Sequence, residues 1–151
     1  LEAISELHVP VFWFWPNPDA GSDGTSNAIR SFREERAPKH FRFFKNMEGR
    51  DFLKLLLHSK GLVGNSSVGI RECSFLGVPV VNMGKRQNKR QRGANVIETE
   101  IDKERIKESV LKQMSHGLYA SEQIYGNGNA GVNIADMLSK HDPGIEKTIT
   151  Y

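Results

Sequence analysis

Short apolar runs alternate with longer segments of helical periodicity along most of this chain. The runs predict buried strands at about 9–15, 41–44, 62–63, 79–82 and 95–97. Strands that alternate with helices favour βαβ units, whose neighbouring strands are parallel. The expected fold class is therefore α/β, a Rossmann-like parallel sheet with helices on both faces.

The segments between the runs carry helix start and stop signals. Thr25 or Ser26 is suited to cap the first of them, while Gly61 and Gly77 are expected to end the second and third. The helices predicted in this way cover about 27–35, 48–60, 66–76, 102–116 and 130–140.

The helix over 102–116 has the clearest pattern. Asp102 is suited to cap its start, and Ile106, Val110 and Met114 recur every four residues, which predicts a stripe that faces the core.

Four loops follow the carboxyl ends of the predicted strands: the loop around Asn17, and those at 45–47, 65–67 and 84–93. In a parallel α/β sheet, ligands bind beyond the carboxyl ends of the strands. The sequence therefore predicts that these loops meet at one edge and form one site.

The run 61–72 predicts an anion site at that edge. It has the order of a strand, a Gly-Asn-Ser-Ser turn and the start of a helix. The first N–H groups of a helix have no partner within it, and the helix dipole adds partial positive charge. The hydroxyls of Ser66 and Ser67 are able to bind a phosphate, to cap the helix, or to do both. The pattern is neither a P-loop nor Gly-x-Gly-x-x-Gly, which disfavours a nucleoside triphosphate with magnesium and a dinucleotide.

The distribution of charge limits the classes of partner that the sequence suits. The formal net charge is +3, and five cations fall within eight positions: Lys85, Arg86, Lys89, Arg90 and Arg92. A loop of this kind fits a solvated surface, an anionic ligand or a nucleic-acid backbone.

The five His residues are scattered, so no metal site is expected, and no motif for a redox cofactor is present. No run approaches the ~20 apolar residues of a membrane helix, and the start lacks the pattern of a signal peptide. The single Cys73 fits a reducing compartment, so we expect a cytoplasmic location and no membrane partner.

The residues 64–72, 77–84 and Arg86-Gln87 together carry a resemblance to a family. They resemble the UDP-N-acetylglucosamine 2-epimerases, and are nearer to the hydrolysing branch that makes N-acetylmannosamine for sialic acid synthesis. Asn95-Val96 and the stretch 125–130 add two matches in the same order.

The resemblance implies a two-domain enzyme of glycosyltransferase-B architecture with its active site between two Rossmann-like domains. Residues 1–141 would be the C-terminal, UDP-binding domain and 142–151 a tail, with the N-terminal domain absent. By the same likeness the stretch 43–47 cradles uracil, although the relatives' Pro is missing at 46–48. The implied UDP-binding residues are Asn17, Ser66, Ser67 and Gly69, with Glu72 on the ribose hydroxyls and Arg86 at the phosphate or sugar end.

The implied reaction converts UDP-N-acetylglucosamine into N-acetylmannosamine and UDP, through loss of the C2 proton and departure of UDP. The acidic residues credited with this chemistry lie in the other domain, so we expect no catalytic residue and no cofactor here, and an isolated chain that binds UDP weakly without turnover. The expected partners are UDP or UDP-N-acetylglucosamine, the N-terminal domain and further copies in a homo-oligomer. Two alternatives remain: a UDP-sugar-dependent glycosyltransferase of the same architecture, and a non-catalytic anion-binding domain. We expect no nucleic acid, because only one short loop is basic.

Overall fold

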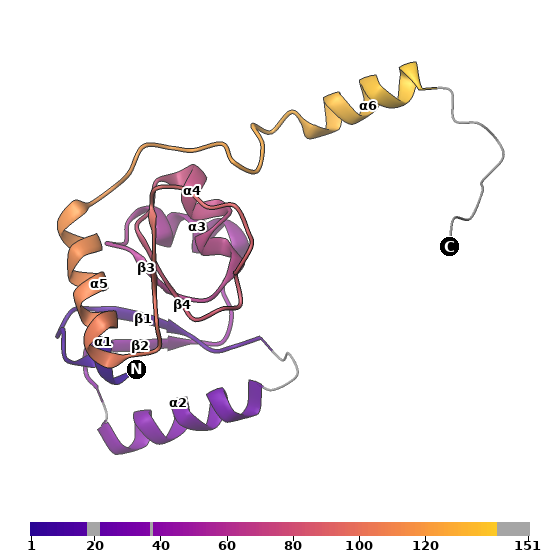
Figure 1. Cartoon of the computed structure of the whole chain (residues 1–151). Coiled ribbons are helices and arrows are strands. Elements are labelled where there is room, and N and C mark those ends of the chain that lie inside the picture. The colour runs from indigo at the N-terminus through magenta and orange to yellow at the C-terminus, as the bar shows by residue number, and fades with distance from the viewer. Residues whose placement is uncertain (18–21, 37, 142–151) are drawn as a thin grey trace, which may run out of the picture.

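The computed structural model of the chain describes residues 1–17, 22–36 and 38–141. Two parallel sheets form within them (Figure 1): β1 pairs with β2, and β4 lies between β3 and β5. The strands are β1 (Val11–Phe14), β2 (Phe41–Phe44), β3 (Leu62–Gly64), β4 (Val80–Met83) and β5 (Val96–Thr99). The predicted parallel α/β fold is confirmed, although the strands divide into two sheets where the sequence predicted one.

Six α-helices and one 3₁₀ turn accompany these strands within the described residues. They are α1 (Glu2–Ser5), α2 (Ser22–Arg36), α3 (Gly49–Leu57), η1 (Ser67–Gly69), α4 (Glu72–Leu76), α5 (Lys103–His116) and α6 (Ala130–Lys140). The sequence predicted α5 and α6 nearly to the residue, and it missed α1.

Two of the predicted helix signals are confirmed. Asp102 caps α5, because its Oδ1 accepts a hydrogen bond of 2.9 Å from the backbone N–H of Arg105. Gly77 ends α4 with φ of 69°, a left-handed conformation that glycine adopts without steric cost.

Two other signals were wrong. Helix α2 begins at Ser22, so Thr25 and Ser26 lie inside it. Helix α3 ends at Leu57, four residues before the predicted stop at Gly61. Gly61 instead serves a close approach, since a Cβ there would lie 3.0 Å from the carbonyl oxygen of Pro79 on the neighbouring segment.

Helices cover both faces of the sheets, as predicted. Neighbouring residues of one strand enter different cores: Val81 packs with α1, α5 and Phe32 of α2, whereas Val80 packs with residues of α3 and α4. Leu62 and Val63 of β3 divide in the same way. Burial on both faces is typical of parallel sheets, and it explains why neighbouring positions at the starts of β3 and β4 are both apolar.

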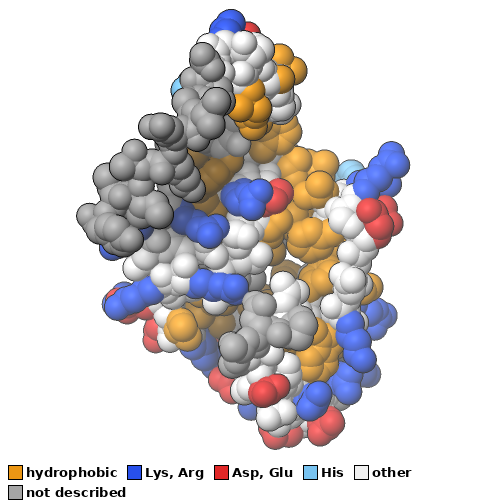
Figure 2. All heavy atoms as spheres, turned by 90° about the vertical axis from the view of Figure 1, so that its right-hand side faces the viewer, with side chains coloured by type: hydrophobic (Ala, Val, Ile, Leu, Met, Phe, Trp, Pro, Cys, Tyr) orange, Lys and Arg blue, Asp and Glu red, His pale blue; other side chains and the backbone are white. Residues whose placement is uncertain are grey.

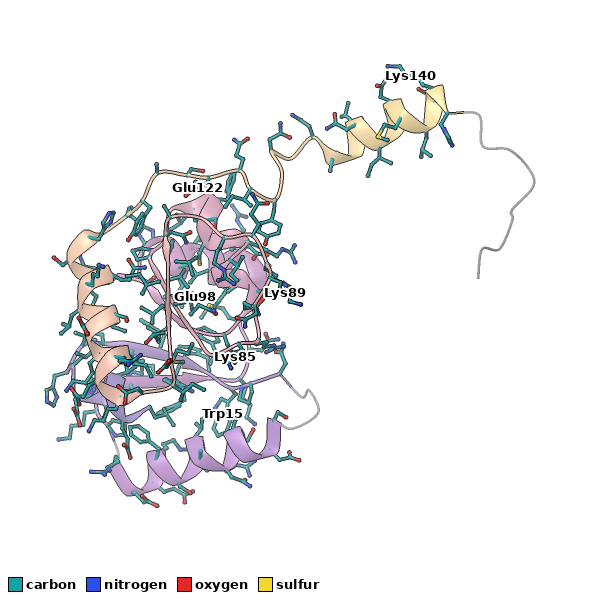
Figure 3. All side chains as sticks on the ribbon, viewed as in Figure 1. Trp15, Lys85, Lys89, Glu98, Glu122 and Lys140 are labelled. Atoms are coloured by element: carbon teal, nitrogen blue, oxygen red, sulfur yellow. The ribbon has the colours of Figure 1, made fainter. Side chains whose placement is uncertain are left out.

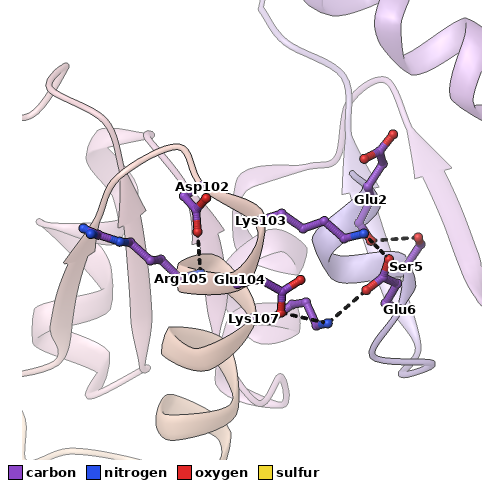
Figure 4. A network of polar contacts seen from close by, with 8 residues as sticks. All are labelled: Glu2, Ser5, Glu6, Asp102, Lys103, Glu104, Arg105 and Lys107. Atoms are coloured by element: carbon purple, nitrogen blue, oxygen red, sulfur yellow. Dashed lines mark hydrogen bonds and ion pairs between the residues drawn. The ribbon is translucent and has the colours of Figure 1, made fainter.

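Ion pairs attach the N-terminal helix to α5 (Figure 4). The Glu6 carboxylate, at the C-terminal end of α1, pairs with the ammonium groups of Lys103 and Lys107, the second at 2.9 Å. Lys107 also pairs with Glu104 on its own helix at 3.3 Å. Ala3 and Ile4 of α1 meanwhile enter the core, so both charge and apolar contact hold α1 in place.

Helix α6 stands clear of the sheets (Figure 1) and buries none of its residues. Ile134, Met137 and Leu138 share one face at i, i+3 and i+4, and each is more than half exposed. None of the helices described is long and apolar enough to cross a membrane.

Candidate nucleotide site

The candidate site lies where the strands end. The loops that follow β1, β2, β3 and β4 begin at Trp15, Lys45, Asn65 and Gly84, which are the loops that the sequence predicted. In Figure 3, Trp15, Lys85 and Lys89 lie on the side of the molecule toward which β1 and β2 point. A ligand crevice at the carboxyl ends of parallel strands is the expected position in an α/β fold.

The Gly-Asn-Ser-Ser turn follows β3 directly, but the helix after it is broken. The hydroxyl oxygen of Ser66 accepts a long hydrogen bond of 3.4 Å from the Val68 N–H, so Ser66 caps the single 3₁₀ turn η1. The carbonyl oxygen of Ser67 accepts from both Ile70 and Arg71, each at 3.0 Å. The continuous helix predicted over 66–76 is therefore wrong, and η1 and the five-residue α4 replace it.

Gly69 has a packing role in this segment. It is buried, and a Cβ there would lie 2.9 Å from Cγ1 of Val80 and 3.4 Å from Cδ2 of Leu62. The absent side chain lets η1 approach β3 and β4 closely. The expected contact of Gly69 with UDP stays a prediction.

Glu72 begins α4, one turn beyond the serines, and is half-buried. Its Oε2 is buried and has no hydrogen-bond partner among the described residues. Glu72 also lines an open groove of about 310 Å³ whose apolar walls come from α3, α4 and the segment after α5; they include Leu53, Phe75 and Tyr125. A buried carboxylate oxygen without a donor is costly, and a ligand hydroxyl is one group that would satisfy it.

The basic loop after β4 divides into outward and inward cations. Lys85, Arg86, Lys89 and Arg90 are exposed. Arg92 instead turns inward, where its guanidinium pairs with Glu98 of β5 at 2.5 Å and donates to the Gln87 carbonyl oxygen at 2.8 Å. The face toward which β1 and β2 point carries Lys and Arg side chains in its middle, beside exposed hydrophobic side chains (Figure 2).

Gln87 joins this basic loop to the serine turn. Its side-chain Nε2 donates a 2.8 Å hydrogen bond to the carbonyl oxygen of Asn65, and the residue is only 3% exposed. Sequence reasoning missed this role, because a glutamine within a polar loop carries no pattern that predicts burial. The bond brings together two of the four predicted loops by direct contact.

The segment after α5 closes over the same region. The Tyr125 hydroxyl donates to the carbonyl oxygen of Gln91 at 2.6 Å, and Glu122 Oε1 accepts from the Ala94 N–H at 2.7 Å. Both contacts reach the end of the basic loop, so residues far apart in sequence fix its course.

The first two loops follow β1 and β2 of the two-stranded sheet, and the hydrogen bonds described below for them lie within that sheet and at the start of α3. Asn17 is exposed beyond Trp15, and the described residues stop there before resuming at Ser22. The Trp15 N–H extends the β1–β2 pairing with a 2.9 Å bond to the Phe44 carbonyl oxygen. After β2, Glu48 caps α3 by accepting from two backbone N–H groups.

Cys73 lies behind this site without taking part in it. The residue is fully buried, and desolvation together with the nearby charge of Glu72 raises the pKa of the thiol to about 12. A thiol with such a pKa stays protonated at neutral pH, and is therefore a poor nucleophile.

Residues 1–139 match the sequence profile of the UDP-N-acetylglucosamine 2-epimerases. The chain belongs to this family. A UDP-N-acetylglucosamine 2-epimerase of Neisseria meningitidis is 30% identical over 119 residues, which are 79% of this chain and 30% of the relative. The polysialic acid biosynthesis protein P7 of Escherichia coli is 38% identical over 90 residues, or 60% of this chain and 22% of the relative.

The name of a third relative contains a different substrate. The UDP-N,N'-diacetylbacillosamine 2-epimerase (hydrolyzing) of Legionella pneumophila is 25% identical over 138 residues, which are 91% of this chain and 36% of the relative. The chain therefore covers between 22% and 36% of the length of these three relatives. The match also reaches through most of α6, so this helix is part of the family pattern.

Proposed function

We propose that this chain is the nucleotide-binding half of an enzyme that converts UDP-N-acetylglucosamine into N-acetylmannosamine and UDP. The observation that carries the proposal is the 2.8 Å bond from Gln87 to Asn65, in a chain that belongs to the epimerase family. It joins the turn after β3 to the basic loop after β4, so hydroxyls, backbone N–H groups and cations gather at one edge. Such a set of donors suits a diphosphate.

Five of the six predicted residues contact the nucleotide in this proposal, and Gly69 lets their segment approach the strands closely. Ser66 and Ser67 hold the diphosphate with their hydroxyls and backbone, and Arg86 adds a planar cation suited to its oxygens. Glu72 accepts the ribose hydroxyls, which gives its orphaned Oε2 a donor. Asn17 completes the nucleotide side from the end of β1.

The half described here serves the leaving group. Negative charge develops on UDP as its bond to the sugar breaks, and donors already fixed at that position stabilise the charge without rearranging. The residues that remove the C2 proton and add water would belong to the N-terminal domain. The 151-residue chain should therefore bind UDP weakly and turn over no substrate.

Two observations support a second domain. The chain covers only 30% of its Neisseria relative. Helix α6 lies within the family match, yet it exposes Ile134, Met137 and Leu138 on one face. A helix with an apolar face gains stability by covering it, and the other domain of the enzyme would be its partner. A cytoplasmic location is part of the proposal, since it suits the single, buried Cys73.

Calorimetric titration with UDP tests the proposal. Ser67→Ala and Glu72→Gln should each weaken UDP binding by roughly 1–3 kcal/mol, or about 5- to 150-fold, because the first removes a hydroxyl partner and the second replaces a charged acceptor with a weaker, neutral one. Ser115→Ala and Glu108→Gln on the exposed surface of α5 make the same chemical changes away from the site and should leave affinity unchanged. The assignment would be refuted if the folded chain binds no UDP, or if neither Ser67→Ala nor Glu72→Gln changes its affinity for UDP.

Product analysis separates the reaction from glycosyl transfer. A protein of the relatives' length that contains this chain should release free N-acetylmannosamine and UDP from UDP-N-acetylglucosamine in water. Sugar transfer to an acceptor, with no free N-acetylmannosamine, would favour the glycosyltransferase alternative.

A further inference from the structure

Gln87 contacts the serine turn through one backbone group. Its Nε2 donates to the carbonyl oxygen of Asn65, not to a side chain. A trans peptide is planar, and its carbonyl oxygen and the following N–H point in opposite directions. The bond that holds the Asn65 oxygen therefore also fixes the direction of the Ser66 N–H, which points away from Gln87.

The strands in turn hold Gln87. Its carbonyl oxygen accepts from the Arg92 guanidinium at 2.8 Å, and Arg92 pairs with Glu98 of β5 at 2.5 Å. Glu98 also accepts a 3.2 Å bond from the side chain of Asn82, which is buried in β4. These five residues, from Asn82 to Asn65 by way of Gln87, form what we call the Gln87 relay. It connects β4 and β5 to the turn that follows β3.

We propose that Gln87 is a positioning residue for the diphosphate, because it keeps the 65–66 peptide with its N–H toward the ligand and its carbonyl oxygen away. The inference rests on the proposed function of the same site. A carbonyl oxygen aimed at a phosphate would repel it, whereas an N–H group binds it. With the side chain 3% exposed, Gln87 acts through the peptide and not by touching the nucleotide.

Gln87→Glu is the informative variant, since it keeps the size but places a carboxylate oxygen against the Asn65 carbonyl oxygen. Gln91→Glu makes the same change on an exposed side chain of the same loop and controls for the added charge. NMR titrations with UDP and with uridine, which lacks phosphates, separate the two parts of the ligand. We expect Gln87→Glu to raise the Kd for UDP at least tenfold and that for uridine less than twofold. Gln91→Glu should change the Kd for UDP less than threefold.

The outcomes distinguish the inference from the proposed function. If the unaltered chain is folded and binds no UDP, the proposed function fails. If it binds UDP and the two variants lose the same affinity, the positioning role fails. Equal loss of UDP and uridine affinity in Gln87→Glu would indicate a general structural role and would also overturn it.

A second test covers the case in which Gln87→Glu does not fold. Arg92→Lys keeps the charge but loses the fork that joins Gln87 to Glu98, so UDP affinity should fall while uridine affinity holds; no selective loss would contradict the relay. In the unaltered chain, the Gln87 side-chain amide signals should shift on addition of UDP and not of uridine. Signals that respond to neither ligand would overturn the positioning role.

Discussion

The Tyr119 hydroxyl donates a 2.7 Å hydrogen bond to Oε1 of Gln113, a side chain that is 2% exposed at the inner face of α5. The Nε2 of Gln113 donates to the carbonyl oxygens of Val80 and Asn95, both at 2.8 Å. One amide thus joins α5, the starts of β4 and β5, and the segment that continues toward Tyr125. This buried polar contact lies at the amino-terminal ends of both strands, opposite the edge that carries the candidate site.

Replacing this amide should destabilise the fold. Gln113→Leu keeps a similar volume but leaves the Tyr119 hydroxyl without its partner and removes the side-chain hydrogen bonds to the carbonyl oxygens of Val80 and Asn95, so we expect a loss of about 1–3 kcal/mol in unfolding free energy. Chemical denaturation measures it, with Gln123→Leu on the exposed surface as the matched control. A loss no larger than that of the control would show that the contact contributes nothing.

Gly77 should tolerate no side chain. Its φ is 69°, and an added Cβ would lie 2.2 Å from the carbonyl oxygen of Tyr119, whose N–H bonds back to the Gly77 carbonyl. Strain in the left-handed region costs ~1–2 kcal/mol and the backbone clash adds to it, so Gly77→Ala should lower stability by about 3 kcal/mol or more.

Replacing Gly24 with alanine should have the opposite effect on stability from the same substitution at Gly77. It lies inside α2 with nothing within 4 Å of an added Cβ. Gly24→Ala should raise stability by about 0.5–1 kcal/mol, because alanine favours a helix interior. Equal effects of the two substitutions in thermal unfolding would contradict the backbone assignment of Gly77.

The ion pairs of Glu6 predict a pH dependence (Figure 4). The hydrogen bonds from Lys103 and Lys107 lower the pKa of the Glu6 carboxyl from 4.5 to about 2. Because the folded pKa lies below the unfolded one, this stabilisation is present above pH 4.5 and is lost as the pH falls toward 2. Glu6→Gln should therefore lower Tm at pH 7, and the difference from the unaltered chain should vanish near pH 2. Glu35→Gln on exposed α2 is the control, and a deficit unchanged by pH would refute the assignment.

Thiol chemistry checks the position of Cys73. Burial raises the pKa of its thiol to about 12, so a thiol-specific reagent at pH 8 should react only after the chain unfolds. Rapid labelling of the native chain would contradict this burial.

The fold was largely predictable because local patterns carry it. All five strands were located within about two residues, since each is a short apolar run bounded by polar or glycine residues. Asp102 and Gly77 act at helix ends through their own chemistry, and both were predicted. The start of α2 was not, because Thr25 and Ser26 have sound capping side chains but Ser22 begins the helix earlier.

Buried polar contacts escaped prediction for a different reason. The stripe on α5 was predicted at Ile106, Val110 and Met114, yet the third buried position is Gln113. The role of Gln87 was equally unpredictable, because its hydrogen-bond partner Asn65 lies 22 residues away in the sequence. Periodicity records which positions are apolar, and it holds no information on which polar side chains find a distant partner.

UDP should bind at the carboxyl edge of the strands, and an NMR titration of the backbone amides with UDP would locate it there. The largest shifts should fall on 65–72 and 84–88, with weaker ones near Asn17, while the α1–α5 contact of Glu6 and Lys107 stays unchanged. No shifts at saturating UDP, or shifts that gather at α1 and α5, would show that UDP does not bind at this edge.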